Sequence, residues 1–241
     1  MSLSLLDFLN GCFSLIFVCV SVGIGLKIAS KFFEIKQRMF FLVGIGWAGI
    51  CSPWWPSSTA FVCYLITGKG LEPHVYFFIG VVLLHFFMTI YLIGLTEMIL
   101  HNYQKLIIVI LIAIGVAFET YFLYNLLGDP SQIGYLTGLF DITYAGFVMI
   151  YLIFCILLIY TFNVLFSIKA LKSESRDIKL KGKLLIIAIN CYFIGAILDA
   201  AITLTPITLI LTRSILISSS ILFYLGFLLP NFIKNRMLKS T

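Results

Sequence analysis

Charged residues are scarce in this sequence. Only 11% of its 241 residues are Asp, Glu, Lys or Arg, against about a quarter in ordinary globular chains, and 61% are hydrophobic. A soluble domain of this size has too little interior to bury that much apolar surface. The scarcity of charge therefore excludes an ordinary soluble domain and favours a chain that lies in membrane lipid.

The short motifs of common catalytic centres are also missing. The sequence has no HExxH or HxxxH pattern, no GxSxG motif, and no P-loop or Rossmann glycine pattern. It has no aspartate pair within one helix of the kind that aspartyl intramembrane chemistry needs. No lysine lies between residues 207 and 233 to form a retinal Schiff base. We therefore expect no catalytic residues and no cofactor, and no motif in the sequence favours an enzyme.

Cysteine is present, but without the spacing of a metal site or a redox pair. No CxxC motif and no Cys/His ligand spacing occurs, and every cysteine falls in an apolar stretch. We expect small buried side chains, no structural disulfide and no metal ion. The six residues are Cys12, Cys19, Cys51, Cys63, Cys155 and Cys191.

Long apolar runs are what the sequence does contain. Seven of them reach about 20 residues, the length that a helix needs to cross a bilayer. They predict an all-α fold, a single polytopic transmembrane bundle of seven helices over residues 1–241. The expected spans are 5–27, 39–66, 74–100, 104–125, 136–167, 183–204 and 207–230. No basic residue precedes the first run, so we expect a retained helix and not a secretory signal.

The basic residues fall on alternate connections. Fourteen of the 16 lie between spans one and two, three and four, or five and six, or in the C-terminal tail. The opposite side receives only Lys69, and Arg213 lies within the last span. The positive-inside rule then predicts an outside N-terminus and a cytoplasmic C-terminus, in the plasma membrane. The net charge of +6 reflects topology and contact with membrane lipid, and no nucleic-acid partner is expected.

Asp141, Asp199 and Arg213 are charged residues inside predicted spans, where a charge at the centre costs about 2.5–3.5 kcal/mol on insertion scales. Asp141, Asp199 and Arg213 share a depth of about 7–10 Å below the outer boundary, from the rise per residue of a helix. The short turn at 205–206 makes the last two helices neighbours, so we predict an Asp199–Arg213 ion pair. One interpretation is that the pair only holds these two helices together. Another is that Asp141 joins the pair in a water-accessible cavity. A third is that the charges lie at the membrane surface. In the cavity one carboxylate would remain for a cation or a proton.

The second span contains an unusual run of prolines and tryptophans. Pro53 and Pro56 each remove a backbone donor and disturb the carbonyl four residues earlier. The common result is a kink that packs helices. The alternative is a broken helix that lines a pocket, with a tryptophan as an aromatic wall for a cation or a flat apolar ligand. The candidate ligand-binding residues are therefore Trp54, Trp55, Asp141, Asp199 and Arg213.

The last span ends in an aromatic–Gly-Phe-x-x-Pro exit that is followed by basic residues. The stretch reads Phe223-Tyr-Leu-Gly-Phe-Leu-Leu-Pro-Asn-Phe-Ile-Lys-Asn-Arg236. Together with the helix count and orientation, it resembles the seven-helix membrane sensor regions of microbial histidine kinases. In that family an output domain follows, whereas this sequence ends at Thr241, so the resemblance implies the sensory half alone. It implies no ligand residues.

We therefore expect a receptor-like sensory module that binds a small ligand or a proton in its outer half. A separate cytoplasmic protein partner would read the helix movement through residues 169–182 or the tail. The first alternative is a small proton- or cation-coupled transporter or channel. An integral-membrane enzyme acting on lipid lacks its motifs, and a structural subunit of a larger complex would use the buried charges to meet partner helices.

Overall fold

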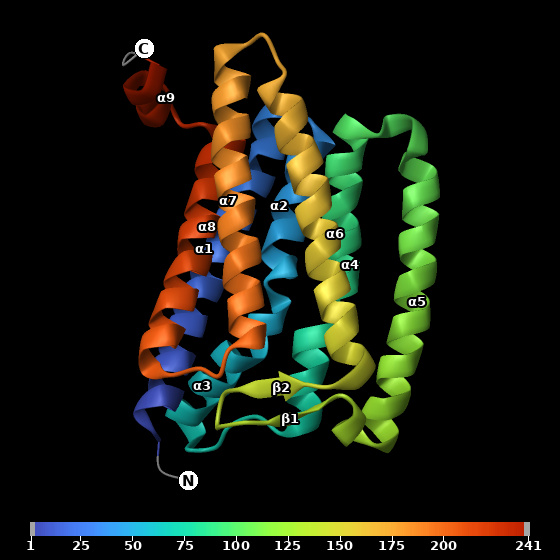
Figure 1. The fold of residues 1–241 in the computed structure, drawn as a ribbon, viewed down its shortest axis with the longest axis vertical. Coiled ribbons are helices and arrows are strands. Elements are labelled where there is room, and N and C mark those ends of the chain that lie inside the picture. The colour runs from blue at the N-terminus through green and yellow to red at the C-terminus, as the bar shows by residue number, and fades with distance from the viewer. Residues whose placement is uncertain (1–2, 239–241) are drawn as a thin grey trace.

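Long helices that run along one axis form the body of the molecule (Figure 1). The computed structural model describes residues 3–238. Six of its helical segments are long and apolar enough to cross a membrane, which marks the chain as an integral membrane protein. They are α1 (Leu5–Ile35), α4 (Pro73–Ile99), the segment His101–Gly128 made of η2 (His101–Tyr103) and α5 (Gln104–Gly128), α6 (Gly146–Leu171), α7 (Arg176–Ala201) and α8 (Pro206–Leu228).

The second predicted span, 39–66, is a broken helix. α2 (Arg38–Ile50) is followed by one 3-10 turn, η1 (Ser52–Trp54), and then by α3 (Trp55–Thr67). Pro53 and Pro56 lie in the first turns of η1 and α3, where a missing N–H leaves no intrahelical bond unmade. The two prolines therefore end one helix and begin the next, and Trp54 lies at the break.

The fifth predicted span, 136–167, was placed too early in the sequence. α6 begins only at Gly146, after the turn η3 (Pro130–Gln132) and an antiparallel hairpin of β1 (Gly134–Leu136) and β2 (Ile142–Tyr144). The prediction that Asp141 lies inside a helix is therefore wrong, because Asp141 lies between the strands. A short apolar run fits a strand as well as a helix. Gly146, with φ +52°, takes the left-handed conformation that separates hairpin from helix.

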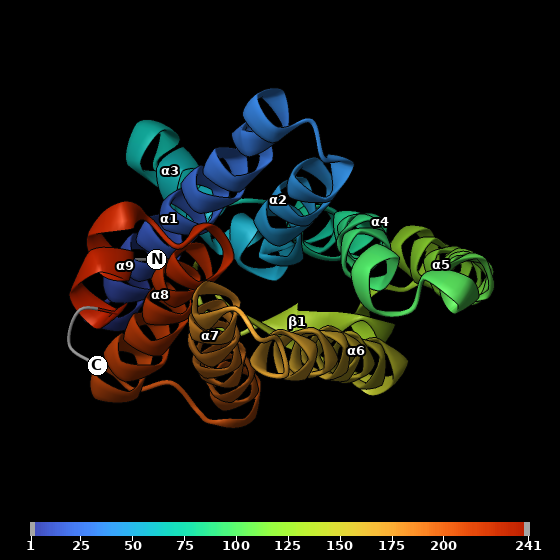
Figure 2. The ribbon, with the colours of Figure 1, turned by 90° about the horizontal axis from the view of Figure 1, so that it is seen from above.

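α5 stands at the edge of the bundle next to α4 (Figure 2), and its Phe118 and Phe122 belong to the same buried core as residues of α1, α2, α4, α6, α7 and α8. In the last turn of α2, the indole of Trp47 stacks on Phe223 of α8 with 3.8 Å between ring centroids. Tyr91 of α4 and Tyr192 of α7 pack against the same indole. Aromatic packing thus joins α2, α4, α7 and α8 in the middle of the bundle.

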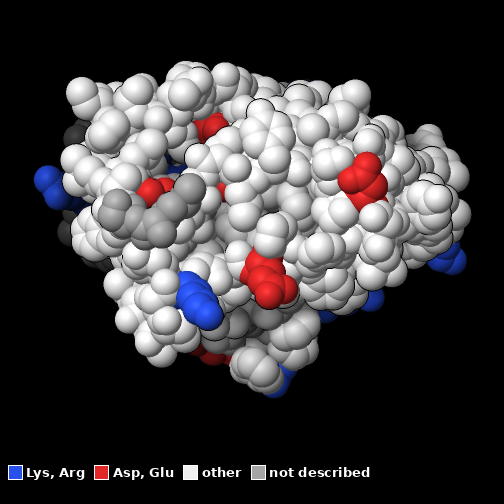
Figure 3. Space-filling view, turned by 90° about the horizontal axis from the view of Figure 1, so that it is seen from below, with Lys and Arg blue, Asp and Glu red and all other residues white. Residues whose placement is uncertain are grey.

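The two ends of the bundle differ. The α1–α2, α4–α5 and α6–α7 connections and α9 (Asn231–Leu238) lie at one end, which we call the basic end. The start of α1, the β-hairpin and the α7–α8 turn lie at the other, the hairpin end. Figure 3 shows the hairpin end as largely uncharged surface with scattered acidic and basic side chains. The basic connections of the sequence therefore share one end of the fold.

Close packing joins α1 to α2. A Cβ on Gly25 would lie 2.5 Å from the carbonyl oxygen of Gly44, and a Cβ on Gly44 would lie 2.4 Å from the backbone nitrogen of Ala29. In lipid, small residues at a helix crossing allow the close van der Waals packing that holds the helices together. The crossing therefore depends on the absence of a side chain at both glycines.

We expect Gly44→Ala to destabilise the fold, because the added methyl group must push the two backbones apart. Overpacking of this kind costs about 1–3 kcal/mol, and thermal unfolding of the purified protein in detergent measures the loss. The matched control is Gly23→Ala in α1, since a Cβ at that position has no atom within 4 Å. An equal loss of stability in the two variants would contradict the close crossing.

Candidate functional site

Arg213 of α8 is a charged side chain in the interior of the bundle. Its side chain is 2% exposed, and its Nη1 donates to Oδ2 of Asp199 in α7 over 2.6 Å. The turn between Ala201 and Pro206 is short, so α7 and α8 pack against each other as neighbours. The predicted Asp199–Arg213 ion pair is confirmed. An unpaired charge there would cost several kcal/mol, so each partner requires the other.

Trp54 contacts both members of this ion pair. The indole Nε1 donates to the same Oδ2 of Asp199 over 2.8 Å, and the guanidinium carbon of Arg213 lies 5.9 Å from the centre of the Trp54 ring. The break between α2 and α3 places the indole there, because Trp54 ends the 3-10 turn. The broken helix therefore contributes a side chain to the charged site. This agrees with the interpretation in which the prolines break the helix and a tryptophan lines a pocket.

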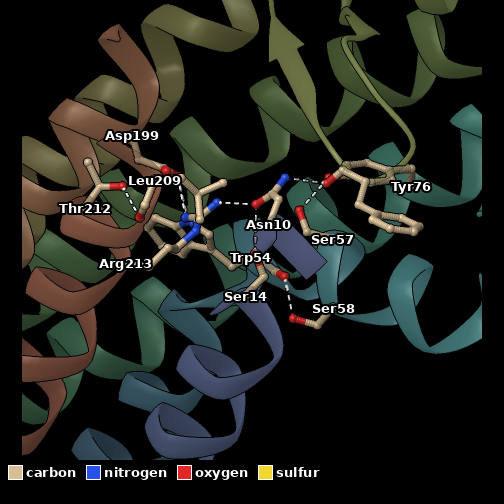
Figure 4. Close-up of polar contacts among 11 residues, drawn as sticks. Asn10, Ser14, Trp54, Ser57, Ser58, Tyr76, Asp199, Leu209, Thr212 and Arg213 are labelled. Carbon is tan, nitrogen blue, oxygen red and sulfur yellow. Dashed lines mark hydrogen bonds and ion pairs between the residues drawn. The ribbon is translucent and has the colours of Figure 1, made fainter. Parts of the chain in front are cut away.

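A polar network continues from Arg213 to the hairpin (Figure 4). The Nη2 of Arg213 donates to Oδ1 of Asn10 over 3.0 Å, and the Nδ2 of Asn10 donates to the carbonyl of Phe140 over 3.1 Å. Ser14 donates to the Asn10 side chain, and the Tyr76 hydroxyl donates to the same Phe140 carbonyl over 3.1 Å. Asn10 thus links α8 through α1 to the loop that carries Asp141.

Asp141 faces the ion pair from that loop. Burial raises the pKa of its carboxyl above the ordinary value, and the Asp199 carboxylate raises it further, while a backbone hydrogen bond from Ile142 and the charge of Arg213 lower it. In the part of the chain that the structure describes, Asp141 makes no ion pair. It is therefore the carboxyl group at this site that is free to take a cation or a proton.

A cavity of about 110 Å³ brings these groups together. Asp141, Asp199 and Arg213 all line it, so two carboxylates face one guanidinium. The aromatic part of the wall consists of Trp54, Tyr76, Tyr144 and Tyr192.

Two buried oxygen atoms at this cavity have no protein partner. Oδ1 of Asp199 and the hydroxyl of Tyr144 make no hydrogen bond with any described residue. Buried polar groups are almost always hydrogen-bonded, to protein, water or ligand. The cavity therefore offers unused acceptors beside its two carboxyl groups, together with one unused donor, the Nε of Arg213, and its aromatic faces attract cations.

Trp55 does not join the other four predicted site residues. Of the described residues that line the cavity, Trp54 is included and Trp55 is not. The Trp55 ring packs edge-on against Phe87 of α4, with 5.9 Å between centroids. Consecutive residues of a helical turn point in different directions, so only one of the two tryptophans can face the site.

Two further polar residues lie within the helices, away from the cavity. Nε2 of His85 in α4 lies 2.8 Å from the carbonyl oxygen of Leu111, and Nδ1 contacts the Tyr151 hydroxyl, so this histidine has hydrogen-bond partners. Glu119 of α5 has two buried carboxylate oxygens without a partner among residues 3–238. The sequence interpretation did not single out Glu119, although a carboxylate within an apolar run is a visible signal.

The described residues hold no group of three or more His, Cys, Asp or Glu placed to bind a metal ion. The cysteines are free in the same part of the chain, with Cys51 and Cys155 buried as expected. Cys19 is exposed, against the expectation of a buried side chain.

No protein-family model matches this chain, and neither a curated protein nor a solved structure is significantly similar to it. The site is a small, partly aromatic cavity in which two carboxyl groups face one guanidinium.

We expect Asp199→Asn to destabilise the protein strongly, because it leaves the buried guanidinium of Arg213 without a counter-charge. Breaking a buried pair costs about 3–5 kcal/mol, and chemical unfolding in detergent measures it. The control is Arg38→Gln, which breaks the more exposed Arg38–Glu97 pair and should cost about 1 kcal/mol or less. Equal effects of the two substitutions would contradict a structural role for the buried pair.

Proposed function

We propose that the protein is a receptor-like sensory module of the plasma membrane that binds a small cation in the charged cavity. The observation that carries the proposal is the set of charged groups that line one cavity, two carboxyl groups and one guanidinium. A cation at Asp141 balances this charge. The aromatic rings of the wall suit a small organic ammonium ion, which is attracted to ring faces as well as to carboxylates.

The proposed orientation places the hairpin end outside and the basic end in the cytoplasm. Its support is the concentration of lysine and arginine on the connections of the basic end, which is what the positive-inside rule describes. The broken segment from α2 through α3 then counts as a seventh span, and the N-terminus lies outside. In this orientation the charged groups of the cavity lie in the outer half of the bundle.

The proposed signal is a rearrangement of the helices that share the site. A cation at Asp141 changes the field at Asp199 and Arg213, which tie α7 to α8 and, through Trp54, to the break after α2. A cytoplasmic partner would read the movement at residues 169–182 or at the tail. The resemblance of residues 223–236 to the end of seven-helix sensor regions supports this reading.

A proton- or cation-coupled transporter is the alternative. The observation that favours it is the broken helix at the site, because interrupted helices line the binding sites of many secondary transporters. Protein reconstituted in liposomes distinguishes the two. Cation-driven proton flux would favour transport, and cation binding without flux favours the sensory module.

We expect tetramethylammonium and methylammonium to bind the purified protein, with heat of binding measured by titration calorimetry. Asp141→Asn should weaken binding about tenfold or more, because it removes the carboxylate that neutralises the cation. The control is Glu72→Gln, which removes an exposed carboxylate from the same end of the bundle. Unchanged affinity in Asp141→Asn would overturn the assignment.

The same titration should depend on pH. Burial raises the pKa of Asp141, so at low pH a proton competes with the cation for this carboxyl. Cation affinity should therefore rise with pH through the raised pKa of Asp141 and then level off. Tetramethylammonium serves as the probe because its own charge does not titrate. An affinity that falls as the pH rises would contradict competition at a carboxyl.

A further inference from the structure

A second and larger cavity, of about 400 Å³, lies at the basic end of the bundle. The C-terminal parts of α4, α6 and α8 and the N-terminal parts of α2 and α7 surround it. Most of its wall is apolar, and no described residue that lines it is acidic. The apolar lining includes Met39, Phe40, Ile99, Phe166, Leu185 and Phe227.

Two lysines are among the residues that line this apolar cavity. Lys169 of α6 donates from Nζ to the carbonyl of Met98 over 2.6 Å, and Lys181 of α7 donates from Nζ to the carbonyl of Phe227 over 3.1 Å. Each ammonium group has three N–H donors, and each uses one of them on described residues. The carbonyl bonds hold both cations at the cavity and leave donors for an anion.

Two acidic residues beside the cavity are paired with other cations. Glu97, next to Met98, forms an ion pair with Arg38 over 2.9 Å, and Asp177 forms one with Lys234. Both pairs lie beside the cavity and outside its lining. The described residues that line the cavity therefore carry positive charge, on Lys169 and Lys181, and no negative charge.

We propose that this cavity binds a phospholipid with an anionic headgroup. The phosphate accepts hydrogen bonds from Lys169 and Lys181, and an acyl chain lies along the wall formed by Phe40, Phe166 and Phe227. A free anion would use the lysines and leave the apolar wall unoccupied, whereas a phospholipid matches both parts. Basic cavities between helix ends on the cytoplasmic side are suited to anionic headgroups. The site is independent of the cation site at the opposite end.

The test uses the full chain in an uncharged detergent and counts bound lipids by native mass spectrometry. The probes are phosphatidylglycerol, phosphatidylcholine with the same acyl chains, and glycerol 3-phosphate. Phosphatidylglycerol should bind most tightly, because it alone combines an anionic headgroup with acyl chains. Equal binding of phosphatidylcholine would overturn the role of charge. Equal binding of glycerol 3-phosphate would show a site for a free anion and overturn the lipid.

Variants locate the lipid. Lys169→Met and Lys181→Met keep the aliphatic stems and should each weaken phosphatidylglycerol binding about fivefold, the value of one basic residue near an anionic headgroup. Lys183→Met is the matched control, since Lys183 is exposed on α7 outside the cavity, and it should change affinity by about twofold at most. An equal effect of Lys183→Met would mean general surface attraction and overturn the site.

Ile178→Trp tests the cavity without changing its charge. Ile178 lines the cavity and is partly exposed, so an indole at this position fills space that the acyl chain needs while both lysines remain. Binding of phosphatidylglycerol should fall, with the thermal unfolding midpoint of the lipid-free protein unchanged. Full binding by a folded Ile178→Trp protein would place the lipid elsewhere and overturn the proposal.

Discussion

The buried guanidinium of Arg213 is the constraint around which the hairpin end of this protein is built. A cation in an apolar bundle is stable only when it is paired with an opposite charge, and the partners of Arg213 come from three directions. Asp199 supplies the charge from α7, and Asn10 of α1 supplies an amide oxygen. Trp54 supplies a ring face and a donor to the shared carboxylate. One side chain therefore fixes the relation of α8 to α7, α1 and the break after α2.

Much of this arrangement could be predicted from the sequence, because a charged residue within an apolar span is costly in lipid and therefore needs a partner. The Asp199–Arg213 pair follows from two expensive residues on either side of a short turn. The break after α2 follows from Pro53 and Pro56, whose missing donors limit where a helix can continue.

Other parts had no readable signal. Asp141 was assigned to a helix because residues 136–167 are apolar, and hydropathy does not distinguish an apolar hairpin from the start of a span. Asn10 was overlooked because its role depends on contacts with residues 130 and 203 positions away, one of them with a backbone carbonyl. Trp55 was included because two adjacent tryptophans in a sequence do not indicate which of the two side chains faces the cavity. These contacts depend on tertiary packing and not on local pattern.

The two proposed sites lie at opposite ends of the same helices. α7 carries Asp199 at the charged cavity and Lys181 at the basic-end cavity, and α2 lines both cavities through Ile50 and Phe40. A helix that packs as a rigid element transmits a shift at one end to the other. The aromatic packing of Trp47, Phe223 and Tyr192 lies between the sites and couples α2, α7 and α8. Cation binding and lipid binding would therefore act on the same helices.

The central claim is that Asp141 is the vacant carboxyl of the charged cavity and exchanges its proton for a cation. Infrared difference spectroscopy of the protein, with tetramethylammonium added below the raised pKa of Asp141, tests it most directly. The account predicts that the cation removes a protonated-carboxyl band, and that Asp141→Asn lacks this change. Cation binding that leaves the carboxyl bands unchanged, or the same band loss in Asp141→Asn, would contradict it.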